Sequence, residues 1–258
     1  MVPLGRTGLS VSRLGLGLAS IGGLFAPVPA AQAAATVDRA WELGVRLYDT
    51  APVYGYGRSE AHAGAALAPR PRGQYVLCTK VGRLIEPGGP DTQPIWADPP
   101  PGVGPRLDHT HPAVLRSAAE SLDRLGLDRV DVLHIHDPDE DYPTAVTEAY
   151  RALAELRRAG VIGALSLGVN HADVAARFLR DAPPPGPDCV LLAGRYTLLV
   201  RRPEGPSSDR RDLSNSPERS RGESPGFIGE RTSTVRSAGR PTPGRPSSGS
   251  PGWTGRRC

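Results

Sequence analysis

The sequence predicts an α/β protein with a parallel sheet of the (β/α)8 TIM-barrel type. Short apolar stretches alternate with amphipathic, helix-forming stretches from residue 13 to residue 194. The apolar stretches are hydrophobic almost throughout, which is typical of strands that are covered on both faces. Repeated β-α units of this kind form either a barrel or a doubly wound sheet.

A missing glycine favours the barrel over the doubly wound sheet. The first predicted strand carries "GLGLAS", which lacks the third glycine of the G-x-G-x-x-G dinucleotide fingerprint. We expect six strands, so the barrel is incomplete and spans about residues 1–200. The predicted strands are 13–19, 45–49, 75–80, 129–136, 162–169 and 188–194.

Helical stretches separate these strands, and their ends carry the expected residues. Gly44 and Gly160 each follow an amphipathic run, as glycine does where a helix ends. Pro112 lies in the first turn of another helix, where its missing N–H costs nothing. The predicted helices are 34–44, 58–68, 111–126, 144–160 and 171–181.

Two segments break the alternation. Residues 81–110 are rich in proline and glycine, and we interpret them as one long, partly polyproline loop. Residues 201–258 are dominated by Arg, Ser, Gly and Pro, with few aliphatic residues. Such a tail cannot bury enough apolar surface to offset its chain entropy, so we predict that it is disordered.

Charge and cysteine content narrow the function classes. The net charge of +4 comes from the tail, which holds twelve arginines against six acids, so no nucleic-acid partner is expected. Three cysteines without C-x-x-C spacing favour a reducing cytoplasm over a disulfide framework.

No apolar run in the sequence is long enough to span a membrane. A signal-peptide interpretation of residues 14–35 is weakened because Gly15, Gly17, Gly22, Gly23 and Pro27 interrupt the apolar part.

Polar residues end several of the predicted strands. In a β/α barrel the reactive groups gather at the C-terminal ends of the strands, so these side chains should converge. Each also has a structural interpretation: Asp49 as a turn cap, for example, or Asn170 as a helix N-cap. The candidates are Asp49, Tyr54, Lys80, His136, Asn170 and Tyr196.

Lys80 is the only lysine in the chain, whereas every other long cationic side chain is arginine. We therefore interpret its ammonium as a functional requirement. A cation beside a phenol favours the phenolate and lowers the pKa of tyrosine from about 10, and lysine supplies a compact point charge. A nearby carboxylate keeps the lysine charged. Asp49, Lys80 and Tyr54 would thus form an acid/base group for carbonyl or alcohol chemistry, which needs a hydride carrier.

The strand 129–136 contains two histidines. We expect His134 and His136 to point to opposite faces, one inward and the other toward the helices. His136 ends the strand and is the candidate that hydrogen-bonds the substrate oxygen. His134 is expected to be a packing residue.

These segments resemble the aldo-keto reductases. "YDTAPVYGYGRSE", "LCTKVGR" and "VDVLHIHDPD" are similar to the segments that carry the family's Asp, Tyr, Lys and His tetrad on a (β/α)8 barrel. "GYGRSE", "IHDPD" and "LLAGRYTLL" resemble the subgroup of L-fucose, D-threo-aldose and pyridoxal dehydrogenases. The resemblance covers roughly residues 3–199.

The resemblance implies a function and further site residues. The activity would be NAD- or NADP-dependent oxidoreduction of a sugar or aldehyde. Asn170 would bind the nicotinamide carboxamide, Tyr196 would stack under the ring, and Trp96 would form an apolar wall for the substrate. Val169 departs from the serine that is common in the family, so the contact with the carboxamide would be weaker. No metal is implied.

The resemblance ends abruptly after residue 199. We expect either a reading-frame shift or a genuine tail, and an incomplete barrel with open sheet edges and little activity. One alternative function is an inactive barrel remnant whose basic tail binds acidic partners or nothing. Another is a barrel lyase that uses Lys80 as a Schiff base. The choice between NAD and NADP, the sugar and the oligomeric state stay open.

Overall fold

A computed structural model describes residues 1–194 of the protein. They fall in the first of the two units into which the chain divides, Met1–Arg210. The predicted tail 201–258 and the candidate residue Tyr196 lie outside the described residues.

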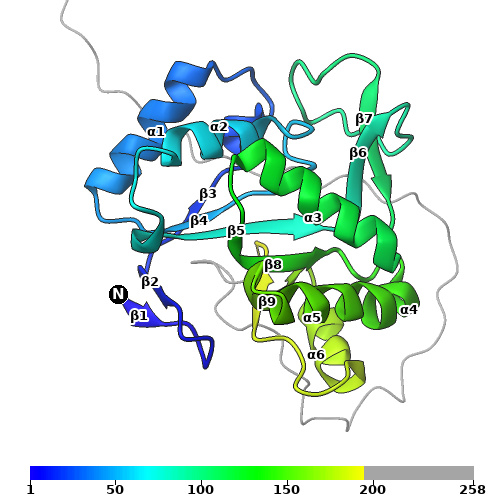
Figure 1. The fold of residues 1–258 in the computed structure, drawn as a ribbon. Coiled ribbons are helices and arrows are strands. Elements are labelled where there is room, and N and C mark those ends of the chain that lie inside the picture. The colour runs from blue at the N-terminus through cyan, green and yellow to red at the C-terminus, as the bar shows by residue number, and fades with distance from the viewer. Residues whose placement is uncertain (195–258) are drawn as a thin grey trace, which may run out of the picture. The chain divides into compact units, whose positions relative to one another are not determined.

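A six-stranded, wholly parallel sheet forms the centre of this unit (Figure 1). The strands of this sheet pair in chain order, each with the next strand that belongs to the same sheet, as in a barrel and unlike a doubly wound sheet. The fold class predicted from the sequence is therefore confirmed. The strands are β3 (Leu16–Gly17), β4 (Leu47–Asp49), β5 (Val76–Val81), β8 (Val130–His136), β9 (Ile162–Val169) and β10 (Cys189–Leu192).

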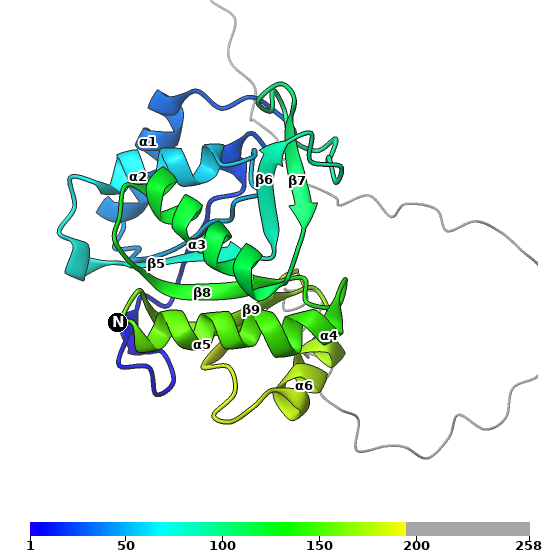
Figure 2. The same ribbon diagram turned by 45° about the vertical axis from the view of Figure 1, so that its right-hand side comes forward.

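Helices follow the strands and cover one face of the sheet, as Figure 2 shows for α3 and α5. The predicted helix 144–160 is observed as three consecutive pieces: α4 (Tyr142–Thr144), a π-helical turn (Ala145–Ala149) and α5 (Tyr150–Arg158). The other helices are α1 (Ala30–Glu42), α2 (Arg58–Leu67), α3 (His111–Leu125) and α6 (Ala172–Asp181). No helix among the described residues is both long and apolar enough to cross a membrane.

The two faces of the sheet bury different side chains. Leu77, Leu133 and Leu165 pack in the main core with the helices. Their strand neighbours point the other way, since side chains alternate along a strand. This inner face is apolar at its N-terminal end, where Val76 and Val132 pack in a second cluster that includes Val11 from the hairpin of β1 (Val2–Pro3) and β2 (Ser10–Val11). Burial on both faces explains the continuous apolar strands.

The interpretation of residues 81–110 as a single loop is wrong. They contain an antiparallel hairpin, β6 (Arg83–Pro87) and β7 (Val103–Leu107). Pro105 lies within β7 and hides the strand pattern, but an isolated two-stranded hairpin tolerates proline because each strand has one unpaired side.

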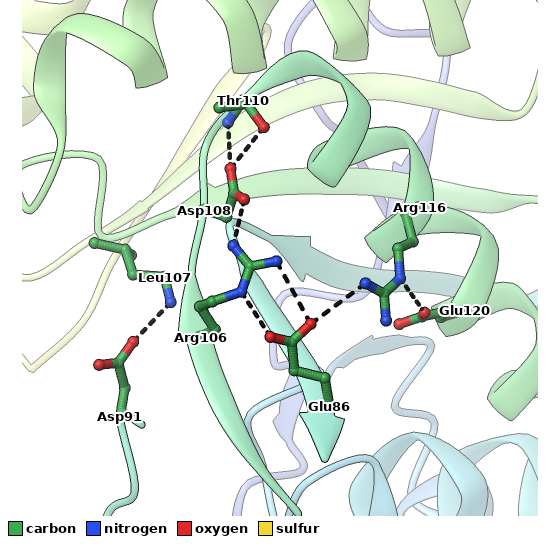
Figure 3. A network of polar contacts seen from close by, with 8 residues as sticks. All are labelled: Glu86, Asp91, Arg106, Leu107, Asp108, Thr110, Arg116 and Glu120. Carbon is green, nitrogen blue, oxygen red and sulfur yellow. Dashed lines mark hydrogen bonds and ion pairs between the residues drawn. The ribbon is translucent and has the colours of Figure 1, made fainter. Parts of the chain in front are cut away.

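Charged side chains fasten this hairpin to itself and to α3 (Figure 3). Arg106 of β7 pairs with Glu86 of β6 at 2.6 Å and also with Asp108. Arg116 of α3 reaches the same Glu86 at 3.3 Å and Glu120 at 2.7 Å. The long insertion is thus a defined element beside the C-terminal ends of the strands.

A buried carboxylate ties α2 to its neighbours. Glu60 is fully buried in the first turn of α2. It accepts hydrogen bonds at 2.6 Å from the Thr79 hydroxyl of β5 and from Arg124 Nε of α3. Because Thr79 precedes Lys80, this bond anchors β5 next to the candidate site.

We predict that Glu60→Ala lowers the free energy of unfolding by about 3 kcal/mol, because it leaves Arg124 without its buried partner. Urea denaturation measures this loss. Glu42→Ala is the matched control, since its ion pair with Arg39 is exposed and should contribute at most about 1 kcal/mol. Equal losses in both variants would contradict the role of Glu60.

Candidate active site

The C-terminal ends of the strands bring the candidate residues together. Asp49 ends β4, Lys80 lies one residue before the end of β5, and His136 ends β8. Asn170 directly follows β9. Since the strands are parallel, these ends lie at one edge of the sheet, where barrel proteins carry reactive groups.

Lys80 is buried at the centre of this group. Its Nζ donates to Asp49 Oδ2 at 2.6 Å and to the backbone carbonyl of Thr50 at 2.7 Å. The same Nζ lies 4.6 Å from the ring centroid of Tyr54. The structure therefore brings the unique lysine, its carboxylate partner and the candidate phenol into direct contact.

A tight glycine turn holds Tyr54 over the site. Gly55 has a φ of +62°, and a Cβ there would lie 2.0 Å from the carbonyl oxygen of Gly22. Only glycine fits this position. The Tyr54 ring packs against Trp96 with centroids 5.6 Å apart and meets His136 edge-on at 6.2 Å.

The pKa of Tyr54 is raised, whereas the sequence predicts that Lys80 lowers it. Burial of the phenol is the largest influence and raises the pKa, while the Lys80 ammonium opposes it. The result is a pKa above the ordinary value for tyrosine, because the cost of desolvating a phenolate exceeds the attraction of the cation here. Lys80 acts in the predicted direction, but Tyr54 stays a protonated donor at neutral pH.

The ion pair of Lys80 and Asp49 beneath the phenol shifts the pKa values of both of its groups. Burial alone would raise the pKa of Asp49, but Lys80 and His134 outweigh it and lower the pKa to about 2. Burial alone would lower the pKa of Lys80, yet Asp49 and Tyr54 raise it. Both groups are therefore charged at neutral pH.

The assignment of His134 and His136 to opposite faces is wrong. Residues two apart on a strand point to the same side, and both rings lie on the inner face. His134 Nε2 is 3.3 Å from Asp49 Oδ1, whereas His136 reaches Tyr54. His134 is therefore part of the charged site as well as being buried.

His136 is neutral at physiological pH. Burial lowers its pKa well below the ordinary histidine value, and the Lys80 and Arg83 cations lower it further. A neutral imidazole can donate from one ring nitrogen and accept at the other. The backbone carbonyl oxygen of His136 lies within hydrogen-bond distance, 3.0 Å, of Nε2 of the buried His109 ring.

Sequence reasoning missed His109. It lies beyond the hairpin, and no local pattern links it to β8. Its ring fits because Gly82 has no side chain: a Cβ there would lie 2.3 Å from His109 Nε2.

A charged group that the sequence did not predict follows His136. Asp137 accepts from Asn170 Nδ2 at 3.0 Å and from Arg83 at 3.1 Å. Arg83 is buried and also pairs with Glu140. Asp137 has a φ of +45°, a left-handed conformation that an aspartate tolerates better than most residues. Asn170 thus contacts a carboxylate, and its predicted contact with a carboxamide stays a prediction.

A cavity of about 120 Å³ opens among these groups. Trp96 does not line it but packs against Tyr54 with the rings tilted, and its Nε1 donates a 2.8 Å hydrogen bond to Gln93. Its predicted role as a substrate wall stays a prediction. The lining residues are Tyr54, Lys80, His136, Asp137, Gly168, Val169, Asn170, Leu191 and Ala193.

One group of potential metal ligands lies beneath this cavity. Ligand atoms of Asp49, Cys78 and His134 come within 4.8 Å of one another. Two features oppose a metal ion there: Lys80 already pairs with Asp49, and burial raises the pKa of the Cys78 thiol well above its usual value, so the thiolate is disfavoured.

Fold and site together define a protein built on β/α-barrel units, with a cluster of charged and aromatic side chains at the strand ends. The sequence pattern of the aldo/keto reductase family matches residues 13–207. The chain belongs to the aldo/keto reductase family.

Several known proteins are similar to this chain. It is 40% identical over 199 residues to a D-threo-aldose 1-dehydrogenase of Pseudomonas sp, a match that covers 74% of this chain and 59% of the relative. It is 41% identical over 216 residues to a pyridoxal 4-dehydrogenase of Microbacterium luteolum, covering 76% and 62%. The chain thus spans about three fifths of the length of these relatives.

A solved structure is also similar to this chain. The glycerol dehydrogenase from Gluconobacter oxydans matches with a TM-score of 0.54 at 29% identity, over 68% of this chain and 50% of that one. These comparisons confirm the family predicted from the sequence.

Acid should remove the stabilisation that Asp49 provides. Its pKa is about 2 when folded and about 3.9 when unfolded, so its contribution of roughly 2 kcal/mol is complete above about pH 5 and is lost as the pH falls toward 2. The difference in unfolding free energy between the wild type and Asp49→Asn should shrink from pH 7 to pH 3. Gln32→Ala, at an exposed and uncharged position, should show no such trend. A constant difference at Asp49 would contradict the ion pair.

Proposed function

We propose that this protein transfers hydride between a nicotinamide cofactor, NAD or NADP, and a sugar hemiacetal or an aldehyde. The observation that carries the proposal is the position of Lys80 Nζ, between Asp49 and the Tyr54 ring. The names of the related proteins, an aldose dehydrogenase and a pyridoxal dehydrogenase, support the substrate class.

Tyr54 is the proposed acid/base group. Its raised pKa keeps the phenol protonated, so it can donate a proton to a carbonyl oxygen during reduction and regain it from the hydroxyl during oxidation. Lys80 stabilises the transient phenolate, and Asp49 holds the ammonium in place. Neutral His136 donates a hydrogen bond that orients the substrate oxygen.

The residues around the cavity fit the nicotinamide end of the cofactor, which supplies the hydride. Gly168 presents no side chain, so the space beside Lys80 stays open: a Cβ there would lie 3.5 Å from Lys80 Cε. Leu191 and Ala193 offer an apolar wall for a flat ring. Asn170 would hold the carboxamide, and Tyr196 would stack on the ring.

The charge of the site favours a neutral substrate. Lys80 and Asp49 compensate each other, whereas Arg83 faces two carboxylates, Asp137 and Glu140. The two cations and three carboxylates of these ion pairs therefore leave a net charge of −1 beside the cavity. Asp137 lines the cavity and can accept hydrogen bonds from substrate hydroxyls, but it repels a phosphate or carboxylate.

The Schiff-base alternative is not supported. A lysine nucleophile must lose its proton, which requires a lowered pKa. Here Asp49 and Tyr54 raise the pKa of Lys80 despite its burial. Its ammonium is also committed to two hydrogen bonds.

Tyr54→Phe should lower the rate of cofactor-dependent sugar or aldehyde oxidation by about a hundredfold or more, because the proton-transfer group is removed. Cofactor absorbance measures turnover. Tyr142→Phe loses a hydroxyl contact with Asp181, away from the site, and should retain the wild-type rate. Equal rates for Tyr54→Phe and the wild type, or no turnover by the wild type, would contradict the proposal.

Asp137→Asn should weaken the preference for neutral sugars. We expect kcat/KM for a neutral aldose to fall roughly tenfold, as when a hydrogen bond to a charged group is lost, while kcat/KM for the corresponding sugar phosphate does not fall. Glu140→Gln removes the same charge from the same Arg83 at a position that does not line the cavity. This control should leave the ratio of the kcat/KM values for the two substrates nearly unchanged. An unchanged ratio in Asp137→Asn would contradict the role of this carboxylate.

A further inference from the structure

A second cavity lies at the opposite ends of the strands from the active site. Its volume is about 980 Å³, far larger than the catalytic cavity. Its walls come from the turn of the N-terminal hairpin, the connection from α1 to β4, and the starts of β5 and β8. Val76 at its edge and Lys80 are four residues apart on β5, which is about 13 Å along an extended strand.

Arginines dominate the charge of this cavity. Its lining contains Arg13, Arg46, Arg72 and Arg129 against a single carboxylate, Asp131. Among the residues that the structure describes, Arg72 alone of the four forms an ion pair, with Asp131 at 2.7 Å. The other three have no carboxylate within ion-pair distance in the part of the chain that the structure describes. The wall therefore carries an excess of about three positive charges.

One of these arginines is already oriented. The Arg46 guanidinium stacks on the Trp41 ring at 3.7 Å. Its Nη1 donates at 2.7 Å to the carbonyls of Trp41 and Val45. Both partners are uncharged, so the guanidinium is held in position and keeps its full charge. Such an arrangement lowers the entropy lost when an anion binds.

The same cavity exposes apolar side chains. Leu14 is 77% exposed and Leu43 is 67% exposed, and both line it. Large aliphatic side chains exposed beside unpaired guanidinium groups suit a ligand that is apolar at one end and anionic at the other.

We propose that this cavity binds a small organic anion, in which a phosphate, sulfate or carboxylate group contacts the arginines and an apolar body packs against Leu14 and Leu43. The site is separate from the catalytic cavity and uses none of its residues. It does not depend on the proposed function.

Anilinonaphthalene sulfonate has both features of the proposed ligand and is the probe. Its binding to the full chain is measured by isothermal titration calorimetry and by its fluorescence. We expect one site per chain, with an affinity that falls as salt is added, because the guanidinium contacts are screened. Inorganic sulfate, which has no apolar body, should compete only weakly.

Matched variants separate this site from other places that bind the dye. The double variant Arg13→Glu/Arg129→Glu should weaken binding by roughly tenfold or more, since two exposed attractive charges become repulsive. Arg151→Glu changes an exposed arginine of α5 that does not line the cavity and should bind like the wild type. All variants keep the arginine-rich segment 201–258, so binding there cannot produce the difference.

The apolar contact is tested in the same way. Leu14→Ser should weaken binding of the dye, whereas Leu179→Ser, which removes an exposed leucine of α6, should not. The proposal is overturned if the Arg13→Glu/Arg129→Glu variant binds the dye as tightly as the wild type. It is also overturned if the control and cavity variants lose affinity equally. Circular dichroism of each variant verifies that the fold is retained.

Discussion

The buried ion pair between Lys80 and Asp49 is the interaction on which the site depends. An ammonium this deeply buried is unfavourable unless a carboxylate and a carbonyl receive its hydrogen bonds, and Asp49 and Thr50 supply both. The partners come from neighbouring strands, so the pair forms only when β4 and β5 lie in register. The same pairing of β4 and β5 therefore buries the strands and places the Lys80 ammonium beneath Tyr54.

Burial and the cation act against each other on Tyr54. The apolar surroundings that exclude water make the phenolate costly, and Lys80 lowers that cost without cancelling it. The phenol is therefore protonated at neutral pH, and under the proposed function the phenolate would form only during proton transfer. His136 is held neutral by the same burial and the same cation. Burial thus sets the direction of both pKa shifts, and Lys80 opposes the shift of Tyr54 and reinforces that of His136.

Patterns local in sequence predicted most of this arrangement. Apolar runs located five of the six strands closely, and polar residues at their ends located Asp49, Lys80 and His136. The failures involve contacts distant in sequence. The β6–β7 hairpin depends on cross-strand pairing and on α3, and Pro105 concealed it. His109 reaches His136 only across the folded chain. The misplacement of His134 was a different error, because the two-residue period of a strand already places it beside His136.

Direct titration of Tyr54 tests whether the Lys80 ammonium acts on its phenol. Carbon-13 labelling of the tyrosine ring carbon that bears the hydroxyl lets NMR follow ionisation of each phenol, with Tyr54→Phe identifying the signal. In Lys80→Met the pKa of Tyr54 should be higher than in the wild type, because burial acts unopposed once the ammonium is gone. An identical Tyr54 pKa in the two proteins would show that Lys80 does not act on this phenol and would contradict the account.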